Sequence, residues 1–142
     1  MPFTPDEKIQ KIVAAYSLDA VDFAVDKFKI KLDWSDSSIR EIETILDRFH
    51  RDLGNSHPTE EQITQIAKIF GSYIGEVFRK NHGGEWGMVE LNGQRFPGMR
   101  SPAGNLFWPQ MRARNRMVNG DDENVWDYYQ ELIKPPAAEK PK

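Results

Sequence analysis

The longest regular pattern of apolar positions lies between residues 59 and 82. Apolar residues recur there three and four positions apart, which is the spacing of one buried helical face. Thr59 and Gln62 fit a capping box at its start, and Gly83-Gly84 stops the pattern. We therefore expect one long central helix, with the rest of the chain packed around it. Its apolar positions are Ile63, Ile66, Ile69, Phe70, Tyr73, Ile74, Val77 and Phe78.

Shorter helical patterns precede the central helix. Thr4 and Pro5, followed by two acidic residues, are typical of a helix start, with Thr4 as the N-cap and Pro5 at the first helical position. Ser17 is a second candidate N-cap, so residues 5–29 form either two helices or one bent helix. Residues 30–34 then read as a short extended connector.

The pattern changes to strands after the double glycine. Residues 85–91 predict a strand, and Asn92-Gly93 is a strong hairpin signal because both turn positions require a positive φ. The chain returns in a second strand that Pro97-Gly98 is expected to break. Residues 105–108 predict a third strand.

Three further helices complete the prediction. One is capped by Ser35 or Asp36 and runs through residue 49; another spans residues 110–118; the last begins at Asp121 or Asp122. Together the patterns predict an α+β fold with N-terminal helices, a long central helix packed on a small antiparallel sheet of about three strands, and one or two C-terminal helices.

Length and composition fit a single domain over residues 1–134 with a disordered tail at 135–142. The net charge is −3, but residues 79–118 hold seven Lys or Arg against two Asp or Glu, a balance of +5 that leaves −8 for the remainder. The chain lacks cysteine, an N-terminal signal-peptide pattern and any long apolar run. We therefore expect a cytoplasmic protein that does not interact with membranes.

Known catalytic and metal-binding patterns are absent from the sequence. His50, His57 and His82 do not have ligand spacing, no serine lies in a nucleophile elbow, and no phosphate-binding loop is present. We therefore expect no metal, no cofactor and no catalytic residues.

Two glycines lie four residues apart within the predicted central helix. Gly71 and Gly75 share one helical face, and each costs about 1 kcal/mol relative to alanine in a helix. We expect another element to pass close to the helix backbone at these positions, because glycine has no Cβ to keep it away.

Glu76 follows these glycines, near the buried stripe. A carboxylate there needs a partner or a raised pKa. One interpretation is a structural ion pair with Arg79 or with a distant arginine. The other is a ligand-binding or catalytic pocket in which Tyr73, Glu76 and Arg79 face Arg95 or Arg114.

Three arginines alternate in the predicted helix at 110–118. Arg112, Arg114 and Arg116, with aromatic residues nearby, could contact nucleic acid. Residues two apart point about 200° apart on a helix, so the three do not form one face. This geometry argues against nucleic-acid binding, and one of the arginines is expected to turn inward to meet Glu76.

The segment 71–86 carries a resemblance. Its Gly-x-Tyr-x-Gly-Glu helix, followed by Gly-Gly-x-Trp, resembles a family of small uncharacterised bacterial α+β domains, as do Leu32-Asp33-Trp34-Ser35 and the late basic helix with its Asn-Gly stop. The resemblance covers roughly residues 30 to 133 and implies a bacterial origin and an α+β fold. It supplies no catalytic residues, and related domains include immunity-type proteins.

These observations favour a non-catalytic domain that binds another protein, and the resemblance implies an immunity protein that neutralises a toxin or effector. Acidic helix faces would meet a basic partner surface, which would speed encounter. The candidate partner-binding residues are Asp33, Trp34, Asp36, Glu41, Asp121, Asp122 and Glu123, with Glu43 and Asp47 on the same acidic helix.

Overall fold

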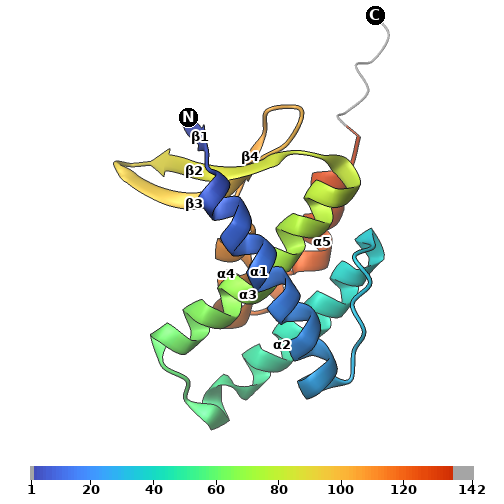
Figure 1. The fold of residues 1–142 in the computed structure, drawn as a ribbon. Helices are drawn as coiled ribbons and strands as arrows, with labels where there is room; N and C mark the ends of the chain where they lie inside the picture. Colours follow the sequence, from blue (N-terminus) through green and yellow to red (C-terminus); the bar gives the residue numbers. More distant parts are fainter. Residues whose placement is uncertain (1, 136–142) are drawn as a thin grey trace, which may run out of the picture.

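The computed structural model describes residues 2–135 and shows five helices and four strands. Figure 1 shows the sheet at one end of the molecule, with most of the helical mass beneath it. The elements are β1 (Phe3–Pro5), α1 (Glu7–Phe23), α2 (Ile39–Ser56), α3 (Glu60–His82), β2 (Glu85–Leu91), β3 (Gln94–Arg100), β4 (Leu106–Phe107), α4 (Pro109–Asn119) and α5 (Val125–Ile133).

The fold is α+β, as predicted, but the sheet has four strands rather than three. The strands lie in the order β1-β2-β3-β4, and all neighbours are antiparallel. The strand missed by the sequence is β1, in which Thr4 pairs with Met88. The predicted N-cap at Thr4 is therefore wrong: Asp6 caps α1, and its Oδ1 accepts from the backbone N–H of Lys8 and Ile9.

The N-terminal helical region is one helix rather than two. Ser17 is buried inside α1, where its hydroxyl donates to the backbone oxygen of Ala14, so it does not cap a second helix. The helix continues as a π-helical turn over Ala24–Phe28 and stops at Lys29, which has a left-handed conformation.

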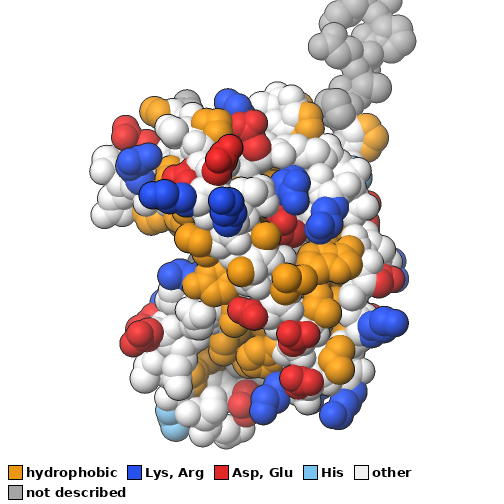
Figure 2. Space-filling view, viewed as in Figure 1, with side chains coloured by type: hydrophobic (Ala, Val, Ile, Leu, Met, Phe, Trp, Pro, Cys, Tyr) orange, Lys and Arg blue, Asp and Glu red, His pale blue; other side chains and the backbone are white. Residues whose placement is uncertain are grey.

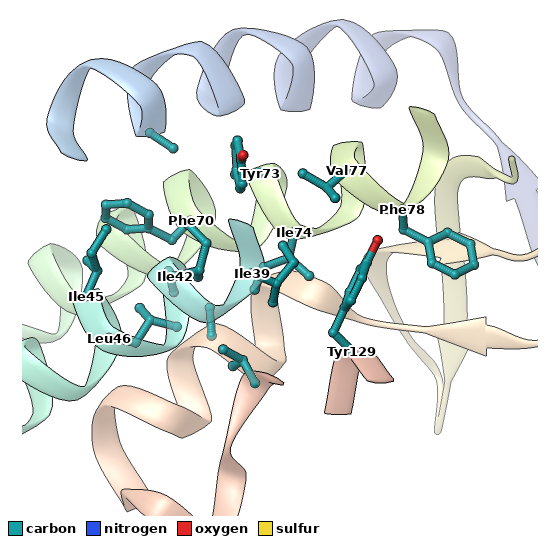
Figure 3. Packing of buried hydrophobic residues seen from close by; sticks show 14 of the residues in the cluster. Ile39, Ile42, Ile45, Leu46, Phe70, Tyr73, Ile74, Val77, Phe78 and Tyr129 are labelled. Atoms are coloured by element: carbon teal, nitrogen blue, oxygen red, sulfur yellow. The ribbon is translucent and has the colours of Figure 1, made fainter. Parts of the chain in front are cut away.

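The central helix α3 has the predicted boundaries. The side chain and backbone of Thr59 form both hydrogen bonds of the capping box with Gln62, and Gly83 ends the helix with a φ of 87°. Helices α1 and α4 pack against α3, and Figure 1 shows α1 crossing in front of α3. Figure 3 shows the core that forms between α3, α2 and Tyr129 of α5.

The second half of α3 packs on the sheet through the close approach predicted at the glycines. An alanine Cβ at Gly75 would lie 2.1 Å from Cζ2 of Trp86, which belongs to β2. At Gly71 it would lie 2.3 Å from the Cα of Gln110 in α4. Glycine is therefore required at both positions for α4 and the sheet to reach α3.

Two predicted boundaries in the second half of the chain need correction. Strand β3 runs through Pro97-Gly98 to Arg100; β4 pairs only with its last two residues, so Pro97 lies where β3 has a partner on one side only. The last helix begins at Val125 with Asn124 as its N-cap, whereas Asp121–Glu123 form a separate 3-10 turn. The tail was predicted at 135–142, and residues 136–142 lie outside the described residues.

Candidate functional site

Glu76 is buried in the centre of the fold, with only 1% of its surface exposed. Its carboxylate accepts hydrogen bonds from Arg79 at 2.8 and 3.1 Å, from Trp86 Nε1 at 3.1 Å and from Gln10 Nε2 at 3.3 Å. Burial raises the pKa of Glu76, but the hydrogen bonds and charge of Arg79, with the Gln10 and Trp86 donors, outweigh it and hold the pKa below its ordinary value. Glu76 thus ties α3 to α1 and β2.

The other members of the predicted pocket lie elsewhere. Arg114 forms an ion pair with Glu60, and Arg95 is exposed on β3. The hydroxyl of Tyr73 lies 2.7 Å from the hydroxyl of Ser38 and accepts from the backbone N–H of Trp34. The structure therefore brings Glu76 and Arg79 together, as an ion pair, without the two facing arginines.

Arg116 is a second buried charge, and the sequence interpretation missed its environment. Its side chain is 0% exposed and contacts Glu43 and Asp47 of α2 at 2.7 Å each and Asp121 at 3.0 Å. The expectation that one arginine of this helix turns inward was right, but the expected partner, Glu76, was wrong. Glu43 and Asp47 lie four residues apart beside the buried stripe of α2, which is the sequence signal that could have indicated this site.

The Arg116 cluster is held together by several elements. Glu43 Oε1 also accepts from the backbone N–H of Val125, at the start of α5. The hydrogen bond from Arg116 holds the pKa of Asp47 below its ordinary value, against the opposing effect of burial. Within the described part of the chain, Nη1 of Arg116 is buried and has no hydrogen-bond partner. The cluster therefore joins α2, α4 and the start of α5 through charge.

Much of the predicted acidic surface is engaged within the molecule. Asp36 accepts from the Tyr129 hydroxyl at 2.5 Å and lies 2.9 Å from His82 Nε2. Asp121 and Glu123 pair with Arg116 and Arg112 respectively. The remaining candidates are the exposed acids Asp33, Glu41 and Asp122, and the half-buried Trp34, whose ring lies under the Lys80 amine.

The arginines of α4 are all paired within the molecule. Arg112 contacts Glu123, Arg114 contacts Glu60, and Arg116 is enclosed by three carboxylates. A nucleic acid would therefore have to compete with these internal partners for each guanidinium group.

The outer face of α1 is the acidic surface that the sequence interpretation overlooked. Asp19, Asp22 and Asp26 are exposed, and none has an ion-pair partner among residues 2–135. Figure 2 shows acidic side chains in a row over α1, with apolar side chains on both sides. The exposed apolar residues of this region are Ile12 (49%), Leu18 (60%) and Val25 (44%). The spacing of the three acids, three and four residues apart, was visible in the sequence.

Within residues 2–135 no group of three or more His, Asp or Glu side chains could hold a metal ion. No helix in the same range is long and apolar enough to cross a membrane. Comparisons with protein-family models, with curated proteins and with solved structures found no match to this chain. The resemblance to a bacterial domain family stays a prediction.

Proposed function

We propose that this chain is a non-catalytic protein-binding domain that uses the outer face of α1 to contact a partner with a basic surface. The observation that carries the proposal is the combination of exposed apolar side chains and unpaired acids on one helix face. We further propose that the domain is bacterial and acts in the cytoplasm as an immunity protein that neutralises a toxin or effector. This finer proposal rests on the sequence resemblance.

Energetic arguments support this face over the acidic residues of α2. Acids such as Glu43 and Asp47 already interact with Arg116, so a partner would have to replace an internal ion pair to use them. The carboxylates of Asp19, Asp22 and Asp26 are solvated and have no internal partner to lose among the described residues. Leu18 and Val25 lose unfavourable contact with water when they are covered, which contributes affinity.

Charged and apolar residues on such a face affect different rate constants of binding. Charges at the rim mainly raise the association rate and make it salt-dependent, whereas buried apolar residues slow dissociation. We therefore expect the three aspartates to control the association rate, and Leu18 and Val25 to control the dissociation rate.

The first experiment is affinity capture of the tagged protein from its own cells, at low and moderate salt, with identification of bound proteins by mass spectrometry. The proposal expects one stoichiometric protein partner with a basic surface that remains bound at moderate salt. Nucleic acid that is recovered at low salt and lost as salt rises would instead favour binding through the basic segment.

Two variants with the same change of charge then locate the contact. One carries Asp19→Asn, Asp22→Asn and Asp26→Asn on α1; the other carries Asp33→Asn, Glu41→Gln and Asp122→Asn, the exposed acids predicted from the sequence. We expect the α1 variant to lower the association rate by about ten-fold at low salt and the second variant to leave it almost unchanged. The opposite result would move the interface to the connector and α2.

A further inference from the structure

A cavity lined by α3, α5 and the β3–β4 loop lies away from the α1 face. It has a volume of about 710 Å³, within the range of small-molecule sites. The end of α3, the loop between β3 and β4 and the last turn of α5 line it, and it is open to solvent on one side. Its apolar wall includes Phe78, Phe107, Pro102, Leu132 and Ile133.

The aromatic wall has a defined geometry. The rings of Phe78 and Phe107 meet edge to face, with centroids 4.9 Å apart and planes at 70°. Both side chains are almost fully buried, so their positions are fixed by the core behind them. An aromatic or branched apolar group in the cavity would meet a preformed surface and would lose little to reorganisation of the protein.

His82 supplies a fixed polar group on the same wall. Its Nε2 lies 2.9 Å from a carboxylate oxygen of Asp36, and the hydroxyl of Tyr129 donates to the other carboxylate oxygen. Because Asp36 accepts both bonds, Nε2 of His82 carries a hydrogen. The other ring nitrogen, Nδ1, has no hydrogen-bond partner among residues 2–135.

The charges around the cavity nearly cancel. Glu131 and Lys134 on the last turn of α5 have opposite signs, and His82 faces Asp36. Because the charges of the lining sum to about zero, a net charge on a ligand would gain little overall attraction. Nδ1 accepts a hydrogen bond when the imidazole is neutral and donates one when it is protonated, and a hydroxyl group can pair with either form.

We propose that this cavity binds a neutral small molecule with an aromatic or branched apolar body and one hydroxyl group, a phenol or an alcohol, whose hydroxyl pairs with Nδ1 of His82. The apolar body contacts Leu132, Ile133 and Pro102, with the almost fully buried rings of Phe78 and Phe107 behind them. The site does not involve the α1 face, so its test is independent of the protein-binding proposal.

The test uses three probes that share one apolar body: 4-ethylphenol, ethylbenzene and 4-ethylbenzoate. Each is titrated into the full-length, isotope-labelled protein and followed by two-dimensional NMR. We expect 4-ethylphenol to give saturable shifts confined to residues that line the cavity. We expect ethylbenzene to bind about five-fold more weakly, the effect of one neutral hydrogen bond, and 4-ethylbenzoate to bind more weakly than the phenol.

A matched pair of variants assigns the hydrogen bond. His82→Gln keeps an amide N–H that can donate to Asp36 and removes the second ring nitrogen. Because His82 is partly exposed at the end of α3, we expect this variant to fold. His57→Gln makes the same change at an exposed position outside the cavity. We expect the first variant to lose the preference for 4-ethylphenol over ethylbenzene and the second to keep it.

Three results would overturn the proposal. The first is the absence of saturable shifts up to the solubility limit of 4-ethylphenol. The second is a set of shifts centred elsewhere, for example on the groove formed by Phe23, Phe49 and Ile66. The third is an unchanged preference for the phenol in His82→Gln, which would show that the hydroxyl pairs with another group.

Discussion

Two fully buried charges of opposite sign, Glu76 in α3 and Arg116 in α4, are compensated in different ways. Glu76 has one cationic partner, Arg79, three residues away on the same helix, and two neutral donors. Arg116 has three anionic partners, two of them in α2, which lies about 70 residues earlier in the chain. The first arrangement is largely local, whereas the second joins parts of the chain that are distant in sequence.

The difference determines what each cluster can contribute. The charges of Glu76 and Arg79 balance. Because Arg79 is partly exposed, water can solvate the Arg79 guanidinium if the pair is broken. With Arg51, which pairs with Asp47 at the exposed edge of the cluster, the Arg116 cluster has an excess of one negative charge, and this is tolerable because the Asp121 side chain is 88% exposed. Arg116 is the one buried cation among these groups, so its loss would leave Glu43 uncompensated, whereas loss of Arg79 would leave Glu76 with two neutral donors.

Replacement of Arg116 with Met is expected to have the largest effect on stability. The change leaves Glu43 without a cation and Asp47 with only the highly exposed Arg51, and breaking a buried ion pair in this way costs about 3–5 kcal/mol. The free energy of unfolding from urea titration measures the loss. Arg114→Met is the matched control, because its partner Glu60 is highly exposed, and it should cost less than about 1 kcal/mol. Equal losses in the two variants would contradict the special role of Arg116.

The position of α4 gives a second test, because α4 is held both by Arg116 and by its approach to Gly71. Gly71→Ala places a Cβ 2.3 Å from a backbone atom of Gln110, which cannot move as a side chain can, so we expect a loss of about 3 kcal/mol. Gly54→Ala in α2 is the control: nothing lies within 4 Å of its Cβ position. That control should stabilise the helix, by up to about 1 kcal/mol.

The same comparison shows what could be predicted from sequence. The capping box at Thr59, the Asn92-Gly93 turn and the close approach at Gly71 each follow from a few neighbouring residues, and all three are present. Strand β1 was missed because three residues that pair with a distant strand carry no pattern of their own. Thr4-Pro5 also matches a helix start, and only the pairing with β2 decides between the two.

The candidate sites also differ in whether their contacts are local in sequence, and only the local contacts could be predicted. The pair of Glu76 with Arg79 was predictable, because residues three apart on a helix are neighbours. The partners of Arg116 and the His82–Asp36–Tyr129 chain depend on how α2, α3, α4 and α5 pack. The sequence of each helix alone does not contain that information.

Replacement of Glu76 with Gln should cost less than the loss of Arg116, about 2 kcal/mol. The amide keeps the size of the carboxylate and one acceptor oxygen, but in either orientation it turns an NH₂ group toward the donors of Arg79 and Gln10. Urea titration measures the loss, and the NMR resonance of the Trp86 indole N–H reports whether the ring moves. A loss as large as that of Arg116→Met would remove the distinction between the two clusters.

The smallest effect is expected in the dependence of stability on pH, where both clusters act in the same direction. The pKa values of Glu76 and Asp47 are lowered in the folded state, from ordinary values of 4.5 and 3.8. Above these ordinary values both groups are ionised whether the chain is folded or unfolded, and their contribution to stability is complete. As the pH falls below them the unfolded chain binds protons first, so stability decreases until the folded-state pKa is passed.

Variants separate the two contributions to this acid sensitivity. Glu76→Gln should flatten the fall in stability that begins near pH 4.5, whereas Asp47→Asn should flatten only the part below about pH 3.8. The measurement is the free energy of unfolding at a series of pH values between 3 and 7 for each variant and the unmodified chain. If Glu76→Gln left the slope unchanged, Glu76 would have the same pKa in the folded and unfolded chain. The hydrogen bonds from Arg79, Gln10 and Trp86 would then do no more than offset its burial.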